Sequence, residues 1–390
     1  MDRARAQPAL RGGIIESIRH LPLAAARLTR VRDAIVATKA PGSGLHEKPT
    51  TIDEDLSRRI ELSRVILIAA IVLHHVRIPA ELSLFTWDNL GYVRGYVQLG
   101  LAKTATSTLT IISGYLLFSS RFECKPAEFM RKKCRTLLIP LLIWNIPLAL
   151  VLFILQKNGQ YLLKYDDLAN GGILNWANAL LGLTHEPVNG PLHFLRNIIG
   201  CNIIALLLAA TFRRHTATVF AVILAIGLLN LDGALVARSD MLIGFFLGGF
   251  VAIRGIDCKL IDFLLPVTGP CFLVSAFLMF YWQISYDSLW WIPHRLVGFL
   301  CAWPIIGYLN RRKLGHVLRK YSKYMFFIFL SHYYVMLLSF VIFSHFFSLE
   351  YFYVYFLVAA PVAIGVSISG QIMAARFMSP LLRIATGGRS

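Results

Sequence analysis

The sequence predicts an all-α protein, a polytopic integral membrane bundle of about ten transmembrane helices. Hydrophobic residues make up 56% of the 390 positions and charged residues only 15%, with a mean hydropathy of +0.61. This composition is too apolar for an ordinary soluble domain. Several uncharged stretches, such as Thr136–Leu155, reach the roughly 18–20 residues that an α-helix needs to cross a bilayer. Lysines and arginines also cluster in alternate connections, as they do in multi-pass membrane proteins.

Ten apolar segments are expected to span the membrane, at residues 63–79, 97–118, 136–155, 191–211, 216–231, 241–253, 263–282, 292–309, 324–344 and 353–375. With both chain ends placed in the cytoplasm, most of the 39 lysines and arginines fall in the tails and the inner connections. This asymmetry follows the positive-inside rule and predicts a multi-pass membrane protein with both termini cytoplasmic. The net charge of +18 is therefore interpreted as a topology signal, and we expect no nucleic-acid partner.

Three regions are expected along the chain. Residues 1–55 are polar and basic and contain no apolar signal-peptide core, so we expect a flexible cytoplasmic tail that contacts anionic membrane lipids. Residues 56–376 should form one transmembrane domain, and residues 377–390 a short cytoplasmic tail. The connections are short except for the outer segment Gln156–Gly190, which carries Trp176. A long loop on one face of a compact bundle is commonly functional.

The first expected span contains ionisable residues in an otherwise apolar helix, RVILIAAIVLHHVRIP from Arg64 to Pro79. Arg64 and His75 are eleven positions apart, close to three full turns, so they share one helix face about 16 Å apart along the axis. His74 lies about 80° around the helix from Arg64. A snorkelling anchor (Arg64) and a packed polar side chain (His75) are the structural alternatives. Because ionisable groups inside a membrane are costly, we interpret the pair as a candidate functional site.

The Arg64–His75 spacing is followed by four stretches that resemble, in the same order, the motifs of membrane acyltransferase family three. They are Ser113-Gly114-Tyr115-Leu116-Leu117, Lys132-Lys133-Cys134-Arg135 followed by Leu137-Leu138-Ile139-Pro140, Pro191-Leu192-His193-Phe194-Leu195-Arg196, and Phe329-Leu330-Ser331-His332. The resemblance covers about Leu56 to Arg376. It implies a helical membrane domain that transfers acyl groups to cell-surface glycans, most like the bacterial exopolysaccharide O-acyltransferases.

Two positions depart from the family pattern. Lys132 stands where the family commonly has an arginine, and lysine offers a point charge in place of a planar fork. His193 stands where the family usually has a tryptophan. Lys132 changes the expected contact with the donor phosphate, and His193 changes the expected pocket wall.

Acyl transfer from a thioester to a sugar hydroxyl needs a base for the hydroxyl proton and a cation or donor for the developing oxyanion. Histidine, with a reference pKa of about 6.5, suits the base near neutral pH. We therefore expect His75 to act as general base or as a transient acyl carrier, with Arg64 as its catalytic partner. Because no Asp or Glu lies within the expected spans, His75 should be oriented by a hydroxyl, an amide or a backbone carbonyl from another span.

Acyl-CoA, carrying acetyl or succinyl, is the expected donor, and no metal or tightly bound cofactor is expected. Its phosphates should meet the basic inner loop formed by Arg131, Lys132, Lys133 and Arg135, although positive-inside anchoring explains the same charges. Interhelical hydrogen bonding and interface anchoring are likewise the alternatives for the remaining pocket candidates. These candidates are Ser113, His193, Arg196, Arg295, His332 and Trp176.

The expected acceptor is a glycan or lipid-linked oligosaccharide, with polysaccharide synthesis or export machinery as a candidate partner. Two functions without acyl-transfer chemistry compete: a transporter or flippase for a lipid-linked glycan, and an assembly component of a secretion complex. Internal repeats and paired broken helices, which are typical of carriers, are missing from the sequence, which favours the enzyme.

Overall fold

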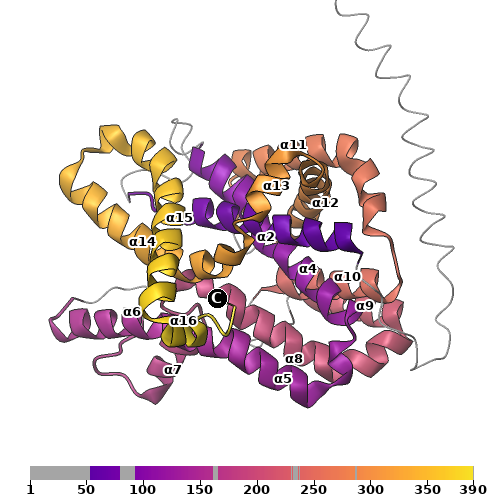
Figure 1. Cartoon of the computed structure of the whole chain (residues 1–390), viewed down its shortest axis with the longest axis horizontal. Coiled ribbons are helices and arrows are strands. Elements are labelled where there is room, and N and C mark those ends of the chain that lie inside the picture. Colours follow the sequence, from indigo (N-terminus) through magenta and orange to yellow (C-terminus); the bar gives the residue numbers. More distant parts are fainter. Residues whose placement is uncertain are drawn as a thin grey trace, which may run out of the picture.

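The computed structural model describes residues 53–79, 93–160, 166–229, 231, 236, 238–285 and 288–389. Across these residues every regular element is a helix, which confirms the predicted all-α class (Figure 1). The tail expected at residues 1–55 lies outside the described residues except for its last three positions.

The main helices are α2 (Glu54–His74), α4 (Thr104–Ser119), α5 (Pro126–Lys133), α6 (Ile139–Lys157), α7 (Ile173–Leu181), α8 (His193–Arg214), α9 (Thr216–Leu228), α10 (Ser239–Ile253), α11 (Leu265–Tyr281), α12 (Trp291–Asn310), α13 (Lys313–Arg319), α14 (Met325–Phe346), α15 (Phe352–Phe377) and α16 (Ser379–Ala385). Short 3-10 and π segments join or extend them: η1 (Val93–Ala102), η2 (Phe122–Cys124), η3 (Cys134–Leu138), η4 (Gly190–Leu192), η5 (Cys258–Leu264), η6 (Ser322–Tyr324) and η7 (Leu349–Tyr351).

Six helical stretches are long and apolar enough to cross a membrane: Pro126–Lys157, Gly190–Arg214, Cys258–Tyr281, Trp291–Asn310, Lys313–Phe346 and Leu349–Phe377. Helices α9 and α10 are apolar but shorter. Each of the ten expected spans overlaps a helix, but α2 and α4, at the first two expected spans, are not among the six stretches. Length and composition therefore support a membrane protein with six candidate spans, and the total of ten stays a prediction.

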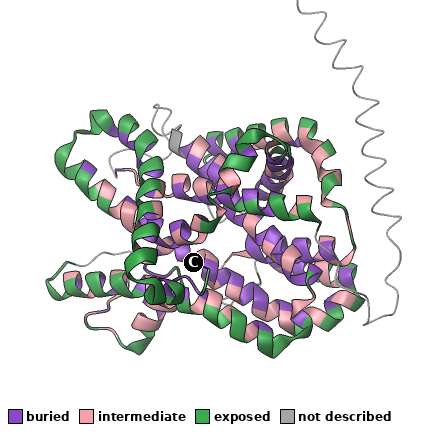
Figure 2. Ribbon diagram, in the orientation of Figure 1, coloured by how far each residue is buried: buried purple, intermediate pink, exposed green. Residues whose placement is uncertain are grey.

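The outward faces of the peripheral helices are apolar, as a lipid-facing surface requires. Figure 2 shows exposed residues along α6, α14 and α15 and buried ones on α4 and α10. On α15, for example, Val354, Leu357 and Val366 are all exposed. An apolar surface of this extent on a folded chain indicates contact with lipid or another protein.

The inner half of α2 is fixed by Arg59, which is only 2% exposed. Its guanidinium donates two hydrogen bonds to the Asp262 carboxylate, of 3.1 and 2.5 Å, and lies 4.1 Å from the centre of the Trp303 ring. Asp53 caps the start of the helix by accepting the Leu56 N–H at 2.6 Å. Arg59 therefore has a structural role in positioning α2 against η5 and α12.

Helices α4 and α10 pack at the centre of the bundle, and glycines let their backbones touch. A Cβ atom at Gly114 would lie 1.9 Å from the Phe245 carbonyl oxygen, and one at Gly248 would lie 1.9 Å from the Ile111 oxygen. Small residues at such crossings are typical of membrane helix packing. Gly114, which follows Ser113 in the second motif, is thus explained by close approach of the two helices.

We expect Gly114→Ala to destabilise the protein, because the added methyl group forces α4 and α10 apart; overpacking of this kind costs roughly 1–3 kcal/mol or more. Thermal unfolding in detergent should show a lower midpoint than the wild type. Gly365→Ala on α15 is the matched control, since a Cβ there meets no atom within 4 Å. Equal midpoints for the two variants would contradict the close-contact explanation.

The outer segment between α6 and α8 packs on itself through α7. Trp176 lies 5.6 Å from Phe153, ring centre to ring centre, in a small apolar cluster separate from the main core. The Gln156 side chain donates to the Asp166 carbonyl oxygen and accepts the Leu168 N–H, both at 2.8 Å. Trp176 is thus a packing residue of this segment, and no wall of the large cavity described below includes it.

A second interaction that holds this segment together, between His185 and Asp166, depends on pH. His185 Nε2 lies 2.9 Å from the Asp166 carboxylate and Nδ1 lies 3.0 Å from the Glu186 carbonyl oxygen. The Glu186 carbonyl, together with Asp166, raises the pKa of His185 above its usual value.

We expect the segment around residues 166–186 to be better protected from hydrogen exchange at pH 6 than at pH 8. A raised folded-state pKa means that the stabilising charge is fully present below the unfolded value of about 6.5 and is lost as pH rises through the folded value. Asp166→Asn should remove most of this pH dependence. A profile unchanged by that substitution would show that the pair does not tie the segment.

Candidate active site

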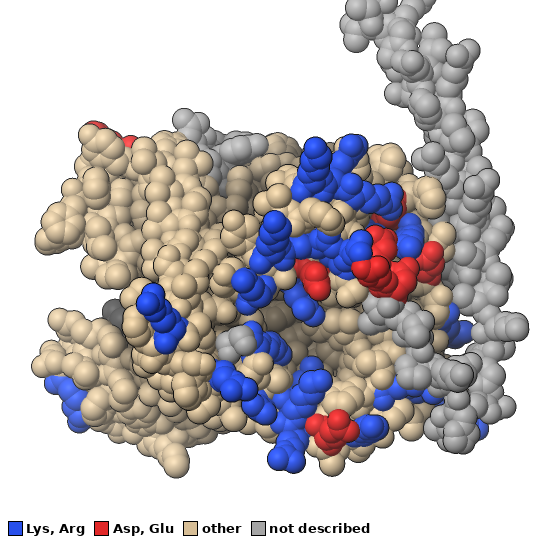
Figure 3. Space-filling model, in the orientation of Figure 1, with Lys and Arg blue, Asp and Glu red and all other residues tan. Residues whose placement is uncertain are grey.

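A cavity of about 720 Å³ opens among α2, α4, α5, α8 and α14. Figure 3 shows a hollow near the centre of the molecule that is bordered by lysine and arginine side chains. Five basic side chains and one carboxylate line the cavity. We call the basic set the basic rim: Arg64, Lys132, Lys133, Lys323 and Arg389.

The charges of the basic rim are held by aromatic packing and only weakly neutralised. Lys132 Nζ lies 4.8 Å from the centre of the Phe122 ring, and Lys133 Nζ lies 5.1 Å from that of Phe129. Glu61 supplies the one carboxylate of the cavity wall, yet it forms no salt bridge with Arg64, although both lie on α2. A net positive cavity of this kind attracts a polyanionic ligand.

Part of the cavity wall is apolar and formed by α8 and α14. Phe194 of α8 and Phe329 of α14 meet edge to face with ring centres 5.7 Å apart, and both belong to the cavity wall. Ile68 on α2 and Ser113 on α4 also line the wall, and the Ser113 hydroxyl donates to the Leu109 carbonyl oxygen at 2.8 Å. Beyond this apolar zone, α2 and α14 continue toward two histidines.

His75 and His332 come together from these two helices, with ring centres 5.3 Å apart. His332 follows Phe329 by one turn of α14, and His75 follows Ile68 by two turns of α2. The ring of His74 lies 4.8 Å from that of His75. The cavity wall extends from the basic rim to Ile68 and Phe329, and the two imidazoles lie beyond these residues and are not part of the wall.

Hydrogen bonds fix the tautomers of both rings. His75 Nδ1 donates to the Ile71 carbonyl oxygen at 2.7 Å, and His332 Nδ1 donates to the Ile328 and Phe329 carbonyl oxygens at 3.1 and 2.8 Å. A carbonyl can only accept, so each neutral ring carries its proton on Nδ1 and its lone pair on Nε2. Each Nε2 is therefore available as a base or a nucleophile.

The surroundings of these rings differ in one respect from the sequence prediction. The carbonyl that orients His75 belongs to Ile71 of its own helix, so the expectation of a partner from another span is wrong for this hydrogen bond. The group from another span is the His332 ring, whose Nε2 is fully buried without a hydrogen-bond partner among the described residues. No group of three or more His, Cys, Asp or Glu within the described chain is arranged to hold a metal ion.

A buried ionic network lies beside His193. The Asp240 carboxylate pairs with Arg238 at 3.1 Å and with Arg295 at 2.6 Å, and accepts from the Ser107 hydroxyl at 2.7 Å. Arg238 Nη1 in turn lies 3.3 Å from His193 Nε2, whose ring donates from Nδ1 to the Gly190 carbonyl oxygen. This network binds α4, α8, α10 and α12 together.

The predicted site residues thus divide into groups. Arg64, Ser113, Lys132 and Lys133 line one cavity, whereas Arg131 and Arg135 of the basic loop are exposed outside it. Arg295 forms an ion pair with Asp240, and the His193 ring contacts Arg238, so both belong to the ionic network. Arg196 donates to the Gly182 and Leu183 carbonyl oxygens and to Asn197.

Sequence reasoning did not single out three residues that the structure places in these groups. Arg389 and Lys323 belong to the basic rim, and Asp240 centres the ionic network. A clue to Asp240 was present, since it is the acidic residue in the first turn of an apolar helix. No local pattern marked Arg389 or Lys323, which only the fold brings to the cavity.

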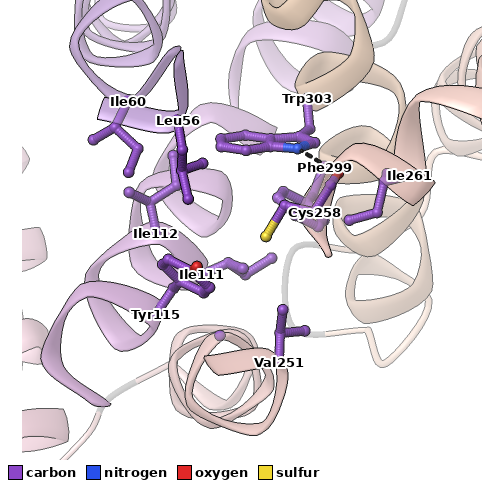
Figure 4. Close-up of a pocket in the computed structure, with 11 residues that line it drawn as sticks. Leu56, Ile60, Ile111, Ile112, Tyr115, Val251, Cys258, Ile261, Phe299 and Trp303 are labelled. Carbon is purple, nitrogen blue, oxygen red and sulfur yellow. Dashed lines mark hydrogen bonds between the residues drawn. The ribbon is translucent and has the colours of Figure 1, made fainter. Parts of the chain in front are cut away.

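A second cavity, of about 30 Å³, is lined by apolar side chains of α2, α4, α10, α12 and the η5 region (Figure 4). Trp303 Nε1 donates to the Cys258 carbonyl oxygen at 3.1 Å beside it. A space of this size holds about one water molecule, so it is a packing gap and no substrate site.

Comparison with known proteins bears on what the large cavity does. The sequence profile of the acyltransferase domain family matches residues 57–369. The chain belongs to this family. It is therefore an acyltransferase, as the five motifs indicated, and the transporter and assembly alternatives are not retained.

One relative illustrates the relationship. The chain is 27% identical over 353 residues to the succinoglycan biosynthesis protein ExoH of Rhizobium meliloti (strain 1021), an alignment that covers 87% of this chain and 94% of the relative. No solved structure gives a significant match.

Proposed function

We propose that this protein is a membrane O-acyltransferase that moves an acyl group from cytoplasmic acyl-CoA to a hydroxyl of a cell-surface or exported glycan. The observation that supports this most directly is the large basic cavity, whose wall reaches Ile68 and Phe329 on the two helices that carry the His75–His332 pair. Family membership supplies the reaction class, and the cavity suggests how a charged donor and a histidine meet.

The shape and charge of the cavity suit acyl-CoA. Its phosphates would lie at the basic rim, where Arg64, Lys132 and Lys133 offer charge-assisted hydrogen bonds. The pantetheine arm is long and thin, and would follow the apolar wall past Ile68 and Phe329. His75 lies about 16 Å along α2 from Arg64, a distance that such an arm can cover.

The histidine pair suits the chemical step. Nε2 of His75 would remove the proton from the acceptor hydroxyl as its oxygen attacks the thioester carbonyl. The carbon–sulfur bond then breaks, and the leaving thiolate takes up the proton, which yields an ester and free coenzyme A. As an acyl carrier, Nε2 would attack the carbonyl first, expel the thiolate, and pass the acyl group to the hydroxyl in a second step.

The acceptor and the acyl group are proposed by likeness to the relative. Its printed name concerns biosynthesis of succinoglycan, an exopolysaccharide, so we propose an exopolysaccharide or its lipid-linked precursor as acceptor and succinyl or acetyl as the acyl group. The basic inner connections support placement in the bacterial inner membrane as a multi-pass protein with both termini in the cytoplasm. Polysaccharide synthesis or export machinery is the proposed partner.

Purified protein in nanodiscs tests the proposal. Succinyl-CoA or acetyl-CoA is mixed with a deacylated exopolysaccharide, free thiol is measured, and the glycan is analysed by mass spectrometry for added ester. We expect thiol release that depends on the glycan and a matching mass increase. Thiol release without glycan modification, or no consumption of either donor, would overturn it.

The lysines of the basic rim should set donor affinity more than the chemical step. We expect Lys132→Gln/Lys133→Gln to raise the KM for acyl-CoA about tenfold or more, with a smaller change in kcat, because two phosphate contacts are lost. Lys125→Gln is the control, since Lys125 is exposed outside the cavity and pairs with Glu128. An unchanged KM in correctly inserted protein would remove these lysines from the donor site.

A further inference from the structure

The segment that follows α16 returns to the large cavity. Gly387 and Gly388 have φ angles of 62° and 82°, and their N–H groups donate to the Ile384 and Arg383 carbonyl oxygens at 3.0 and 2.7 Å. A Cβ atom at Gly387 would lie 2.6 Å from the Arg135 carbonyl oxygen. Such a left-handed turn pressed against another backbone favours glycine. It brings residues 387–389 into the cavity wall.

Packing holds this segment in place. Trp144 Nε1 of α6 donates to the Ala385 carbonyl oxygen at 3.0 Å. Thr386 is 1% exposed, and its hydroxyl donates to the Leu382 carbonyl oxygen at 2.8 Å. The turn is thus anchored by buried groups directly before it enters the cavity wall, and the tail expected at residues 377–390 contains a packed helix and a fixed turn.

Arg389 is the charged end of this turn. Its guanidinium carbon lies 4.1 Å from the centre of the Phe326 ring on α14. The surrounding protein removes part of its hydration and Arg64 repels it, which together lower the pKa of Arg389 to about 10. No salt bridge joins Arg389 to any acidic residue that the structure describes.

Three buried or half-buried arginines of the core are neutralised by carboxylates, whereas Arg389 is exposed where it lines the cavity. Arg59 pairs with Asp262, Arg213 with Glu123, and Arg295 with Asp240. Arg64 and Arg389 repel each other in one cavity whose wall holds a single carboxylate, Glu61, and neither forms a salt bridge among the described residues. An anion bound between them would be stabilised. Stacking on Phe326 holds the guanidinium of Arg389 in position for it.

We propose that Arg389 binds the phosphates of the acyl donor, and that residues 387–389 form a wall of the donor site. This inference rests on the proposed function and adds a donor-positioning residue far from the family motifs. The ligand chemistry is a phosphorylated thioester carrier. An anionic lipid headgroup shares the phosphate chemistry and is separated from the donor by the experiment below.

The test measures binding of coenzyme A itself to the full-length protein in nanodiscs by calorimetry. We expect Arg389→Gln to weaken the Kd about tenfold, the effect of one charge-assisted hydrogen bond, and Arg389→Lys to weaken it less. Arg383→Gln, an exposed α16 residue outside the cavity, should match the wild type. If the wild type binds coenzyme A and Arg389→Gln binds it equally well, the inference is overturned; if the wild type does not bind it, the proposed function fails first.

Kinetics with a shortened donor give a second readout. Arg389→Gln should raise the KM for acyl-CoA and leave unchanged the KM for the corresponding acyl-pantetheine, which lacks the phosphates. Equal effects on both donors would contradict phosphate binding. A loss that follows the anionic lipid content of the nanodisc and ignores the donor would assign Arg389 to a lipid headgroup and overturn the proposal.

Discussion

His75→Ala is expected to abolish acyl transfer, with a loss of roughly 10²–10⁴-fold from the base role alone. Nδ1 of His75 is committed to the Ile71 carbonyl, which leaves Nε2 as the reactive nitrogen, and the His332 ring lies beside it. Steady-state thiol release with acyl-CoA and glycan gives the measurement.

His74→Ala is the matched control for this loss. The His74 ring donates from Nδ1 to the Gln98 carbonyl oxygen, and the Gln98 amide in turn donates to the carbonyl oxygens of Leu73 and Val76. His74 therefore has a structural role at the C-terminal end of α2. The His74→Ala variant should retain activity within about tenfold of wild type. The reverse pattern, with His74 indispensable and His75 replaceable, would show that the catalytic nitrogen is assigned to the wrong histidine.

Arg64→Lys is expected to lower kcat/KM for acyl-CoA by roughly tenfold or more, although the charge is kept. A planar guanidinium grips phosphate through two parallel hydrogen bonds, and an ammonium group does not. Arg64 lines the cavity and forms no salt bridge with the neighbouring Glu61, so its fork is available to a ligand.

Arg58→Lys on the same helix serves as the control, because Arg58 is exposed and pairs with Glu54 outside the cavity. It should leave donor kinetics unchanged. Full activity in Arg64→Lys would reduce Arg64 to a membrane-surface anchor, the alternative that its position on the first span also permits.

The all-α class and the candidate residues Arg64, Ser113, Lys132 and Lys133 could be predicted because they depend on local signals. Apolar runs mark helices wherever they lie, and the spacing of Arg64 and His75 depends only on helix geometry. The family motifs drew attention to Ser113 and the two lysines. The structure adds that Arg64 lines the cavity and that His75 contacts His332.

Other parts of the site depend on tertiary contacts that have no local signature. Arg389 reaches the cavity because two glycines turn the chain against Arg135, which no periodicity reports. Arg295 was named as a pocket candidate, but the α10–α12 contact brings Asp240 within 2.6 Å of it. An ion pair between distant helices becomes visible only when the helices are packed together.

The direction of transfer tests the account most directly. In the proposed topology the basic rim lies on the cytoplasmic side, as the positive-inside rule indicates, and α2 crosses the bilayer. His75, about 16 Å further along α2, would then lie beyond the middle of a hydrocarbon core roughly 30 Å thick. Sealed inverted membrane vesicles expose the cytoplasmic side to the bath. With acyl-CoA in the bath and glycan trapped in the lumen, the account predicts acylation of the luminal glycan, lost in His75→Ala. Acylation only of glycan added to the bath would contradict transfer across the membrane.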